Sequence, residues 1–145
     1  MHKVAPEIED SISVPLLHIA QVTAKRLKAA GISTVGLLGS KYTMTQDFYV
    51  DVLVREGIEV LVPEGDEIDR VNSIIFDELC VGVISGESRQ VLLDAIDRLS
   101  ARGAQGVILG CTELGLLVKS GDTELPVFDT ALIHAEEAAL EALRP

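Results

Sequence analysis

The sequence predicts an α/β fold in which a mainly parallel sheet is flanked by helices, so that the chain forms three layers. Three times along the chain a helical stretch ends in Gly, and a short β-rich run closed by Gly or Pro follows it. Gly just past a helix is typical of a helix end, because it adopts the left-handed conformation without a Cβ clash. Short, wholly apolar strands next to helices are typical of buried parallel strands, and such units join by right-handed crossovers.

Each copy of this pattern consists of a helix, a terminating Gly and an apolar strand. The copies are 25–30, Gly31 and 35–39; 48–55, Gly57 and 60–63; and 91–102, Gly103 and 107–110. Apolar side chains at helical spacing support three of the expected helices. These stripes consist of Val91, Leu92, Ala95, Ile96 and Leu99; of Ile68, Val71, Ile75 and Leu79; and of Leu132, Ala135, Ala139 and Leu143. Asp66 is the expected N-cap of the second striped helix, and residues 82–86 are expected to form a loop.

Two segments precede the first copy. Residues 3–12 have the composition of a helix, and residues 14–19, Val-Pro-Leu-Leu-His-Ile, have that of a strand. The sequence therefore begins in the middle of an alternation of helices and strands.

Composition and charge exclude several classes of protein. The chain has 145 residues, of which 12 are Lys or Arg and 23 are Asp or Glu, so its net charge is −11. This length is sufficient for one hydrophobic core. Apolar residues make up 48% of the chain, which indicates a folded protein and not an intrinsically disordered one. The negative charge disfavours nucleic acid and anionic membranes as partners, because both bind basic surfaces. Its apolar runs are too short to span a bilayer, and no signal segment opens the chain, so the sequence predicts a cytoplasmic protein.

The cysteines and histidines predict neither a disulfide nor a metal site. In a cytoplasmic chain, two cysteines are expected to be thiols. His2, His18 and His134 are scattered along the chain without the spacing of zinc ligands. His18 and His134 stand in apolar contexts and are expected to be core residues, although histidine titrates in a useful pH range.

Ligands of an open parallel sheet bind beyond the carboxyl ends of its strands. In this chain those ends are residues 39–43, 63–65, 110–113 and 128–130. Two of them place hydroxyl or thiol residues after Gly, at the start of a helix. Because free N–H groups and the helix dipole attract anions there, even an acidic chain could hold a small carboxylate.

Cys111 is the leading catalytic candidate. It follows a buried strand, and a helix over residues 112–118 is expected to start at it. That position lowers the pKa of a thiol, and a thiolate acts as a base or as a nucleophile. The alternative is a small buried apolar residue, which is the commonest role of a free Cys. For Cys80, one residue after Leu79 on a helix, the buried apolar role is the prediction.

Ser40, Thr43 and Glu113 each have a structural and a functional interpretation. The hydroxyls of Ser40 and Thr43 could bind a carboxylate, or they could only cap the helix that starts there. Glu113 lies in the first turn of the Cys111 helix, where it either complements the helix dipole or contacts an ammonium group.

Several stretches resemble the aspartate branch of the aspartate/glutamate racemase family. The motif Gly110-Cys111-Thr112-Glu113 after an apolar strand is similar to that family's second cysteine motif. Three other stretches agree with the family in the same order and over nearly the whole chain: residues 15–20, 36–49 and 126–135. Glu113 favours the aspartate branch, since the glutamate racemases of cell-wall synthesis typically carry His at that place.

The resemblance implies a Rossmann-like or flavodoxin-like lobe and a racemase that uses no cofactor. In that mechanism two cysteines face each other across the substrate; one thiolate removes the α-proton and the other thiol protonates the opposite face. Cys111 matches the second cysteine. The residues that match substrate-binding positions are Ser40, Thr43 and Gln46 in one loop, and Thr112 and Glu113 in the cysteine motif. Hydrogen bonds to the substrate carboxylate stabilise the carbanion as it forms.

The resemblance also implies that part of the family's site is missing. Family members have two similar lobes, and their first cysteine precedes a segment similar to residues 1–4. The expected organisation is a remnant of the first lobe over 1–30, a second lobe over 31–128, and a C-terminal helix over 129–145 that packs toward the first lobe. Cys80, on a helix, does not replace the missing thiol, so the isolated chain is expected to have little racemase activity.

Two other functions stay open. Maleate isomerase or arylmalonate decarboxylase chemistry uses similar cysteines in the same superfamily, whereas a non-catalytic carboxylate-binding or subunit-interaction module would need no second thiol. The expected partners are a small amino acid or dicarboxylate, together with a second copy of the chain or a separate N-terminal half. A second polypeptide is expected because residues 14–19 and the stripe from Leu132 to Leu143 lose much of their packing surface.

Overall fold

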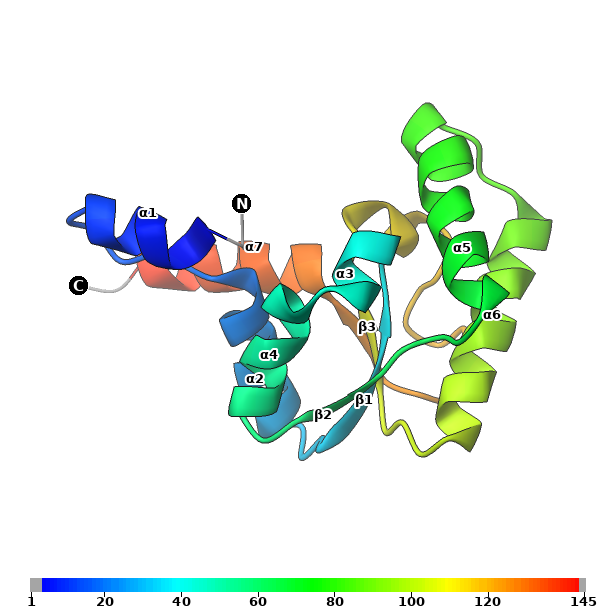
Figure 1. Ribbon diagram of the computed structural model, residues 1–145, viewed down its shortest axis with the longest axis horizontal. Helices are drawn as coiled ribbons and strands as arrows, with labels where there is room; N and C mark the ends of the chain where they lie inside the picture. Colours follow the sequence, from blue (N-terminus) through cyan, green and yellow to red (C-terminus); the bar gives the residue numbers. More distant parts are fainter. Residues whose placement is uncertain (1–3, 144–145) are drawn as a thin grey trace.

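The computed structural model describes residues 4–143 and contains a four-stranded parallel sheet with helices on both faces (Figure 1). The strands lie in the order β2-β1-β3-β4, and each neighbouring pair is parallel. This confirms the predicted α/β class. In chain order the elements are α1 (Ala5–Ser11), α2 (Ile19–Ala29), β1 (Thr34–Leu38), α3 (Lys41–Thr45), α4 (Asp47–Arg55), β2 (Glu59–Leu61), α5 (Asp66–Ser73), the π-helix η2 (Ile74–Glu78), the 3-10 helix η3 (Leu79–Val81), α6 (Gly86–Ala101), β3 (Val107–Leu109), the 3-10 helix η4 (Thr112–Leu116), β4 (Val127–Asp129) and α7 (Thr130–Ala142).

Two apolar cores cover the two faces of the sheet, because successive side chains of a strand point to opposite faces. Leu38 and Leu109 belong to the core formed with α5, η2, α6 and η4. Leu37 and Ile108, their neighbours in sequence, belong to the core formed with α2, α4 and α7. Figure 1 shows these layers, with α5 and α6 on one side of the sheet and α2 and α4 on the other. The strand β3 is wholly apolar because both of its faces are buried, whereas the edge strand β2 begins with the exposed Glu59.

Glycines end the helices where the repeated pattern predicts. Gly31, Gly57 and Gly103 follow α2, α4 and α6 with φ angles of +73°, +78° and +104°. Gly36 is required for a different reason, since a Cβ there would lie 3.0 Å from Cδ1 of Leu99. The absence of a side chain at Gly36 therefore lets α6 pack close to β1.

Two local predictions are wrong. Residues 14–18 form no strand, and α2 already begins at Ile19. Pro15 has no N–H to donate to a neighbouring strand, and in the described part of the chain no strand pairs with this segment. Asp66 is the first residue of α5 and not its N-cap, because Gly65 occupies the cap position with a φ of +57°.

The helix predicted after residue 66 changes its geometry along its length. Regular α-helix ends at Ser73, the chain continues as the π-helix η2, and the 3-10 helix η3 closes the segment at Gly82. The predicted loop before α6 follows. Short π-helical turns are frequent at functional sites, and this one borders the site described below.

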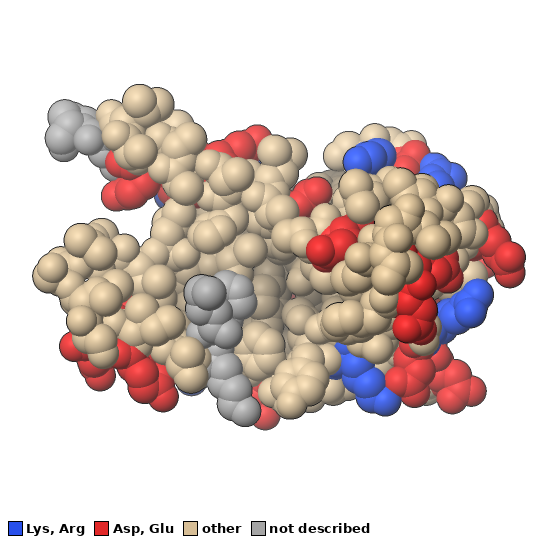
Figure 2. Space-filling view, turned by 90° about the horizontal axis from the view of Figure 1, so that it is seen from above, with Lys and Arg blue, Asp and Glu red and all other residues tan. Residues whose placement is uncertain are grey.

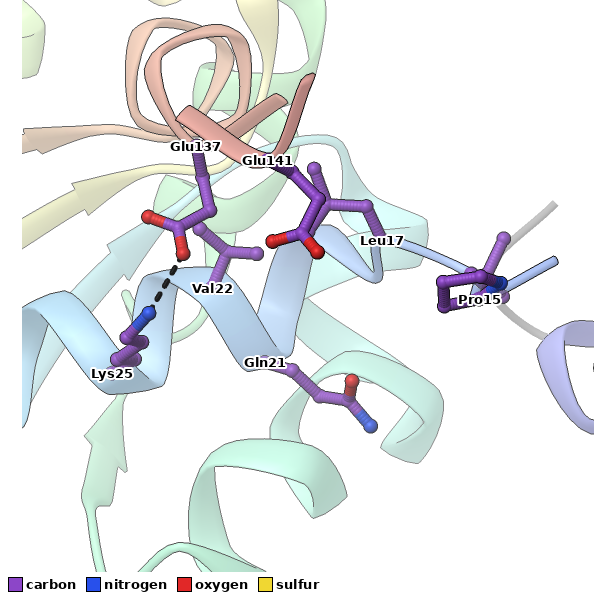
Figure 3. Close-up of a pocket in the computed structure, with 8 residues that line it drawn as sticks. Pro15, Leu17, Gln21, Val22, Lys25, Glu137 and Glu141 are labelled. Atoms are coloured by element: carbon purple, nitrogen blue, oxygen red, sulfur yellow. Dashed lines mark hydrogen bonds and ion pairs between the residues drawn. The ribbon is translucent and has the colours of Figure 1, made fainter. Parts of the chain in front are cut away.

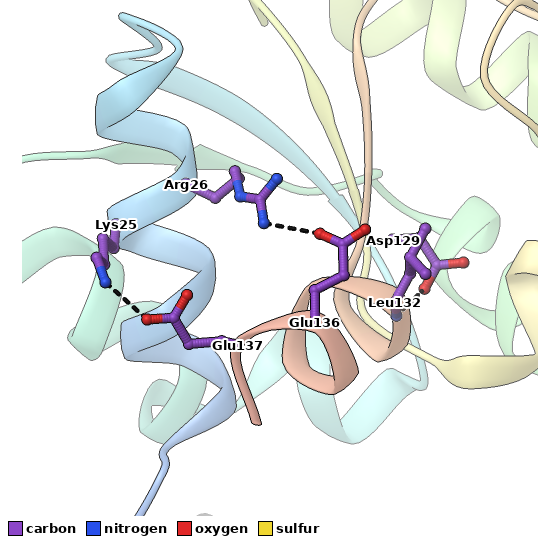
Figure 4. A network of polar contacts seen from close by, with 6 residues as sticks. All are labelled: Lys25, Arg26, Asp129, Leu132, Glu136 and Glu137. Atoms are coloured by element: carbon purple, nitrogen blue, oxygen red, sulfur yellow. Dashed lines mark hydrogen bonds and ion pairs between the residues drawn. The ribbon is translucent and has the colours of Figure 1, made fainter. Parts of the chain in front are cut away.

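Helices α2 and α7 pack against each other, and ion pairs join their exposed sides (Figure 4). Lys25 pairs with Glu137 at 2.7 Å and Arg26 pairs with Glu136 at 2.8 Å. An exposed pair such as that of Arg26 and Glu136 contributes about 0–1 kcal/mol. Asp129 caps α7 by accepting hydrogen bonds from two N–H groups of its first turn. Because α2 lies in the same core as β1 and α4, it is integral to this lobe, and the domain boundary at residue 30 stays a prediction.

Apolar side chains are exposed at the two ends of the chain. Leu132, Leu140 and Leu143 of the C-terminal region are 58%, 53% and 80% exposed, and Val14 is 66% exposed. None of the helices within residues 4–143 combines the length and the apolar character needed to cross a membrane.

Candidate active site

The segments that follow β1, β3 and β4 meet at one edge of the sheet, where parallel strands direct their carboxyl ends. The backbone N–H of Gly110 donates to the carbonyl of Leu38 across 2.7 Å. The hydroxyl of Thr130 donates to the carbonyl of Leu109 across 2.8 Å. The structure thus brings together three of the predicted strand ends, 39–43, 110–113 and 128–130, while residues 63–65 follow the edge strand β2.

Cys111 immediately precedes η4 and is half-buried. Its thiol donates to Oε2 of Glu113 across 2.9 Å, and the hydroxyl of Thr112 donates to the same oxygen across 2.8 Å. These two hydrogen bonds hold the pKa of Glu113 below its usual value. The cysteine motif therefore contains an ionised carboxylate with a thiol as its hydrogen-bond donor.

The prediction of a lowered thiol pKa is wrong. Burial, followed by the hydrogen bond and the charge of Glu113, raises the pKa of Cys111 to about 12. The helix that starts beside the thiol is a 3-10 helix of only five residues, and its few aligned peptide dipoles do not offset these effects. Cys111 is therefore a protonated thiol near neutral pH.

Cys80 is exposed, so the prediction that it packs in an apolar core is wrong as well. It lies in η3, which contacts η4, and its charge is a minor contribution to the raised pKa of Cys111. Leu79 is buried, as its stripe predicts. Successive helical side chains are rotated by roughly 100°, so Cys80 points away from the buried stripe that contains Leu79.

Ser40 and Thr43 lie beside the cysteine motif. Ser40 caps α3, and its Oγ accepts the N–H of Thr43 across 3.3 Å and lies 3.1 Å from the hydroxyl of Thr43. The capping role is thus present in the structure. A Cβ on Gly110 would lie 3.5 Å from Cγ2 of Thr43, so this pair of hydroxyl residues packs next to the start of the Cys111 loop.

A cavity of about 410 Å³ opens beside Ser40 at the same edge. Its lining residues are Ser40, Lys41, Tyr42, Thr45, Gln46, Asn72 and Phe76. Gln46 and Ser40 thus line the same cavity. Sequence reasoning missed Asn72 and Phe76, although their spacing of four residues places both on one helix face. The side-chain oxygen of Asn72 accepts the N–H of Lys41 across 2.8 Å, which joins α5 to the start of α3.

The two histidines that the structure describes have structural contacts. His18 is buried, and its Nδ1 accepts the N–H of Ala20 across 3.2 Å at the start of α2. His134 places Nε2 at 2.9 Å from the carbonyl oxygen of Leu17. His2 lies outside the described residues.

A second cavity, of about 290 Å³, lies between residues 15–17, α2 and α7 (Figure 3). Gln21 and Glu141 are part of its wall, together with the ion pair of Lys25 and Glu137. None of the strand-end residues lines it. Within residues 4–143, no three His, Cys, Asp or Glu side chains are grouped so that they could hold a metal ion.

Comparison with known proteins shows similarity over almost the entire chain. The sequence model of the Asp/Glu/hydantoin racemase family matches residues 1–138. A crystal structure of a candidate Asp/Glu racemase from Yersinia pestis is 50% identical and superposes with a TM-score of 0.95, covering 99% of this chain and 63% of that one. An aspartate racemase homologue from Pyrococcus horikoshii OT3 is 37% identical with a TM-score of 0.91 and the same coverage of both chains.

A curated relative extends this similarity. The broad specificity amino-acid racemase RacX of Bacillus subtilis strain 168 is 26% identical over 135 residues, which are 93% of this chain and 58% of the relative. The chain thus spans only about three-fifths of the length of these proteins.

Proposed function

The chain belongs to the Asp/Glu/hydantoin racemase family, and we propose that it contributes Cys111 and a carboxylate-binding loop to a cofactor-independent amino-acid racemase. The observation that carries the proposal is the hydrogen bond from the Cys111 thiol to Glu113, at the carboxyl end of β3. A thiol next to an ionised carboxylate forms an acid–base pair, and the carboxyl ends of parallel strands are where an α/β sheet binds its ligand.

Racemisation moves a proton at Cα, and Cys111 suits one half of that task. As a protonated thiol it donates its proton to the carbanion on one face, after a base on the other face has removed the α-proton. Cys111 is then a thiolate and the opposite group is protonated, which is the starting state for the reverse direction. The α-ammonium group of a substrate at Glu113 would neutralise the carboxylate and thereby lower the pKa of the thiol.

The hydroxyls of Ser40, Thr43 and Thr112 and the amide of Gln46 are proposed to bind the substrate carboxylate. Ser40 and Thr43 are 3.1 Å apart and lie beside the Cys111 loop. Negative charge spreads from Cα onto the carboxylate when the α-proton leaves, so donors at the carboxylate stabilise the transition state more than the bound substrate. No pyridoxal group is needed in this mechanism.

The acid–base group on the opposite face is proposed to come from another polypeptide segment. Cys80 is the only other cysteine of the chain, and it is exposed on η3. The solved relatives are longer than this chain, which covers 63% of each. The exposed leucines at 132, 140 and 143 offer an apolar surface on which a second copy or a separate N-terminal half could pack.

Exchange of the α-proton in deuterated water tests this function. The full chain is incubated with L-aspartate, L-methionine or L-leucine, and NMR follows loss of the α-proton signal while chiral chromatography follows the D-isomer. Slow exchange that exceeds formation of the D-isomer is expected, because only one of the two acid–base groups is proposed to be on this chain. Cys111→Ser should reduce exchange at least tenfold, whereas Cys80→Ser should leave it unchanged.

Two outcomes would contradict the proposal. Exchange that survives Cys111→Ser would remove Cys111 from the mechanism. Binding of carboxylates without any exchange, also when an N-terminal half of a longer relative is added, would favour a non-catalytic carboxylate-binding module.

A further inference from the structure

The peptide that links Leu109 to Gly110 lies directly before Cys111 and is held from two sides. Its N–H donates to the carbonyl of Leu38 on β1 across 2.7 Å, and its carbonyl oxygen accepts the hydroxyl of Thr130 across 2.8 Å. Because a peptide unit is planar, these two bonds together fix the orientation from which the chain continues into the cysteine motif. Gly110 has no side chain to restrict its own backbone, so the direction of the motif depends on such contacts.

Thr130 is the first residue of α7 and is only 3% exposed. Threonine side chains often bond to nearby backbone groups of their own helix. Here Asp129 caps α7, and the hydroxyl of Thr130 instead reaches the end of β3, 21 residues earlier in the chain. This bond therefore couples the start of α7 to the strand that carries the cysteine motif.

Asp129 contacts the other end of the motif. One oxygen of its carboxylate accepts the N–H groups of Ala131 and Leu132 and so caps α7 (Figure 4). The second oxygen lies against Gly115 of η4, where an added Cβ would come within 2.5 Å of it. Leu109 before the thiol and Gly115 after it thus both contact the junction between β4 and α7.

We propose that Thr130 and Asp129 are positioning residues for Cys111, because they hold the cysteine motif at its two ends. In this way the junction between β4 and α7 keeps the thiol on the carboxylate of Glu113. The inference rests on the proposed function, in which the thiol protonates a carbanion and must be presented at a fixed place to do so.

The protonation state of Cys111 reports whether the motif keeps its place. The charge of Glu113 acts on the thiol most strongly, and that of Cys80 adds a smaller contribution. Figure 2 looks down onto the carboxyl ends of the strands and shows mostly uncharged side chains across the middle of the molecule. Loosening the motif would expose the thiol and separate it from the carboxylate, and both changes would lower the raised pKa of Cys111.

The test measures the state of the thiol and the reaction separately, on the full chain with Cys80→Ser as the parent. Thr130→Val removes the hydroxyl and keeps the shape of the side chain. Iodoacetamide at pH 8.5 should alkylate Cys111 at least threefold faster in this variant than in the parent, because more thiolate is present. Exchange of the α-proton of L-aspartate, L-methionine or L-leucine should fall at least fivefold. Thr130→Ser keeps the hydroxyl and should have both rates within twofold of the parent.

Thr23→Val is the matched control. Thr23 is buried like Thr130, and its hydroxyl also donates to a backbone carbonyl across 2.8 Å, that of Ile19. This bond lies within α2, so its loss should lower the midpoint of urea unfolding to a similar extent and leave the alkylation of Cys111 unchanged.

Gly115→Ala tests the contact of Asp129. The added Cβ would meet the second carboxylate oxygen, so η4 or the carboxylate must move, and alkylation of Cys111 should become at least twofold faster. Gly86→Ala, where nothing lies within 4 Å of the new Cβ, should not change the rate. An alkylation rate in Gly115→Ala equal to that of the parent would overturn the role of Asp129.

The possible results also separate this inference from the proposed function. Equal effects of Thr130→Val and Thr23→Val on alkylation would indicate general loosening of the fold and overturn the inference, as would an unchanged rate in a folded Thr130→Val protein. Thr130→Ala, which places no methyl group against the carbonyl, gives the same measurement if Thr130→Val does not fold. Exchange that persists unchanged in these variants would overturn the positioning role. The expected alkylation pattern without exchange in any protein, the parent included, would overturn the proposed function and leave the positioning of the thiol in place.

Discussion

The thiol of Cys111 donates its hydrogen bond to the carboxylate of Glu113, two residues further along the chain and 2.9 Å away. This contact favours the protonated thiol, because ionisation would place a thiolate against a carboxylate. It also identifies Glu113 as the residue through which a positively charged ligand can change the acidity of Cys111. The protonation state of the motif thus depends on what binds at the carboxylate.

Removing the negative charge of Glu113 should make the Cys111 thiol more acidic. In the wild type its pKa is raised to about 12, so the rate of alkylation at Cys111 should keep rising with pH through pH 10 without reaching a plateau. In Glu113→Gln the midpoint should fall by about one pH unit or more, because one of the causes that raise it is gone. Iodoacetamide rates measured in a Cys80→Ser background from pH 7 to 11 check this, with Glu124→Gln, an exposed position, as the control. Equal profiles for the two variants would contradict the role of Glu113.

Cys80 should react with alkylating agents before Cys111 does in the free chain. Cys80 is solvent-exposed, whereas Cys111 is half-buried and its pKa is raised, so less of its reactive thiolate is present. Limited treatment with iodoacetamide at pH 7.5, followed by peptide mass spectrometry, gives the order of labelling. Labelling of Cys111 first would show that burial and Glu113 do not protect it.

Gly110→Ala should destabilise the fold at the site. The added Cβ would lie 3.0 Å from Cδ1 of Leu37 and 3.1 Å from the carbonyl oxygen of Leu38, and overpacking of this kind costs about 1–3 kcal/mol. Urea unfolding followed by circular dichroism measures the loss. Gly86→Ala is the matched control, since nothing lies within 4 Å of its Cβ position and Ala favours a helix more than Gly does. A smaller loss for Gly110→Ala than for Gly86→Ala would contradict this packing.

Charged substitutions on the exposed face of α7 should reduce self-association. Leu132 and Leu140 are 58% and 53% exposed, and burying their exposed apolar surface against a second chain favours association. Sedimentation at several concentrations should show association of the wild type and a shift toward monomer in the double variant Leu132→Glu with Leu140→Glu. Val54→Glu on α4, where the side chain is 55% exposed, serves as the control. A wild type that is monomeric at all concentrations would contradict a second copy as the partner at this surface and leave a separate N-terminal half as its partner.

The architecture follows from local sequence patterns. Glycines such as Gly31 and Gly57 end the helices where the repeated helix–glycine–strand pattern predicts, because glycine adopts positive φ without strain. The wholly apolar runs become strands covered on both faces. Since parallel strands direct their carboxyl ends to one edge, the proximity of Ser40 and Cys111 also followed from the chain order. These features depend on the spacing of apolar residues and on the positions of glycines along the chain, and both can be read from the sequence.

The tertiary structure alone decided the chemical state and surroundings of the site. Whether the thiol of Cys111 is acidic depends on how much protein covers it and where the Glu113 carboxylate points, and both effects exceed that of a five-residue 3-10 helix. The cavity depends on α5 meeting α3 through Asn72. Periodicity determines which residues form an element and which face is apolar. Desolvation, ion pairing and cavity shape arise from contacts between residues distant in sequence, so they exist only once the chain has packed.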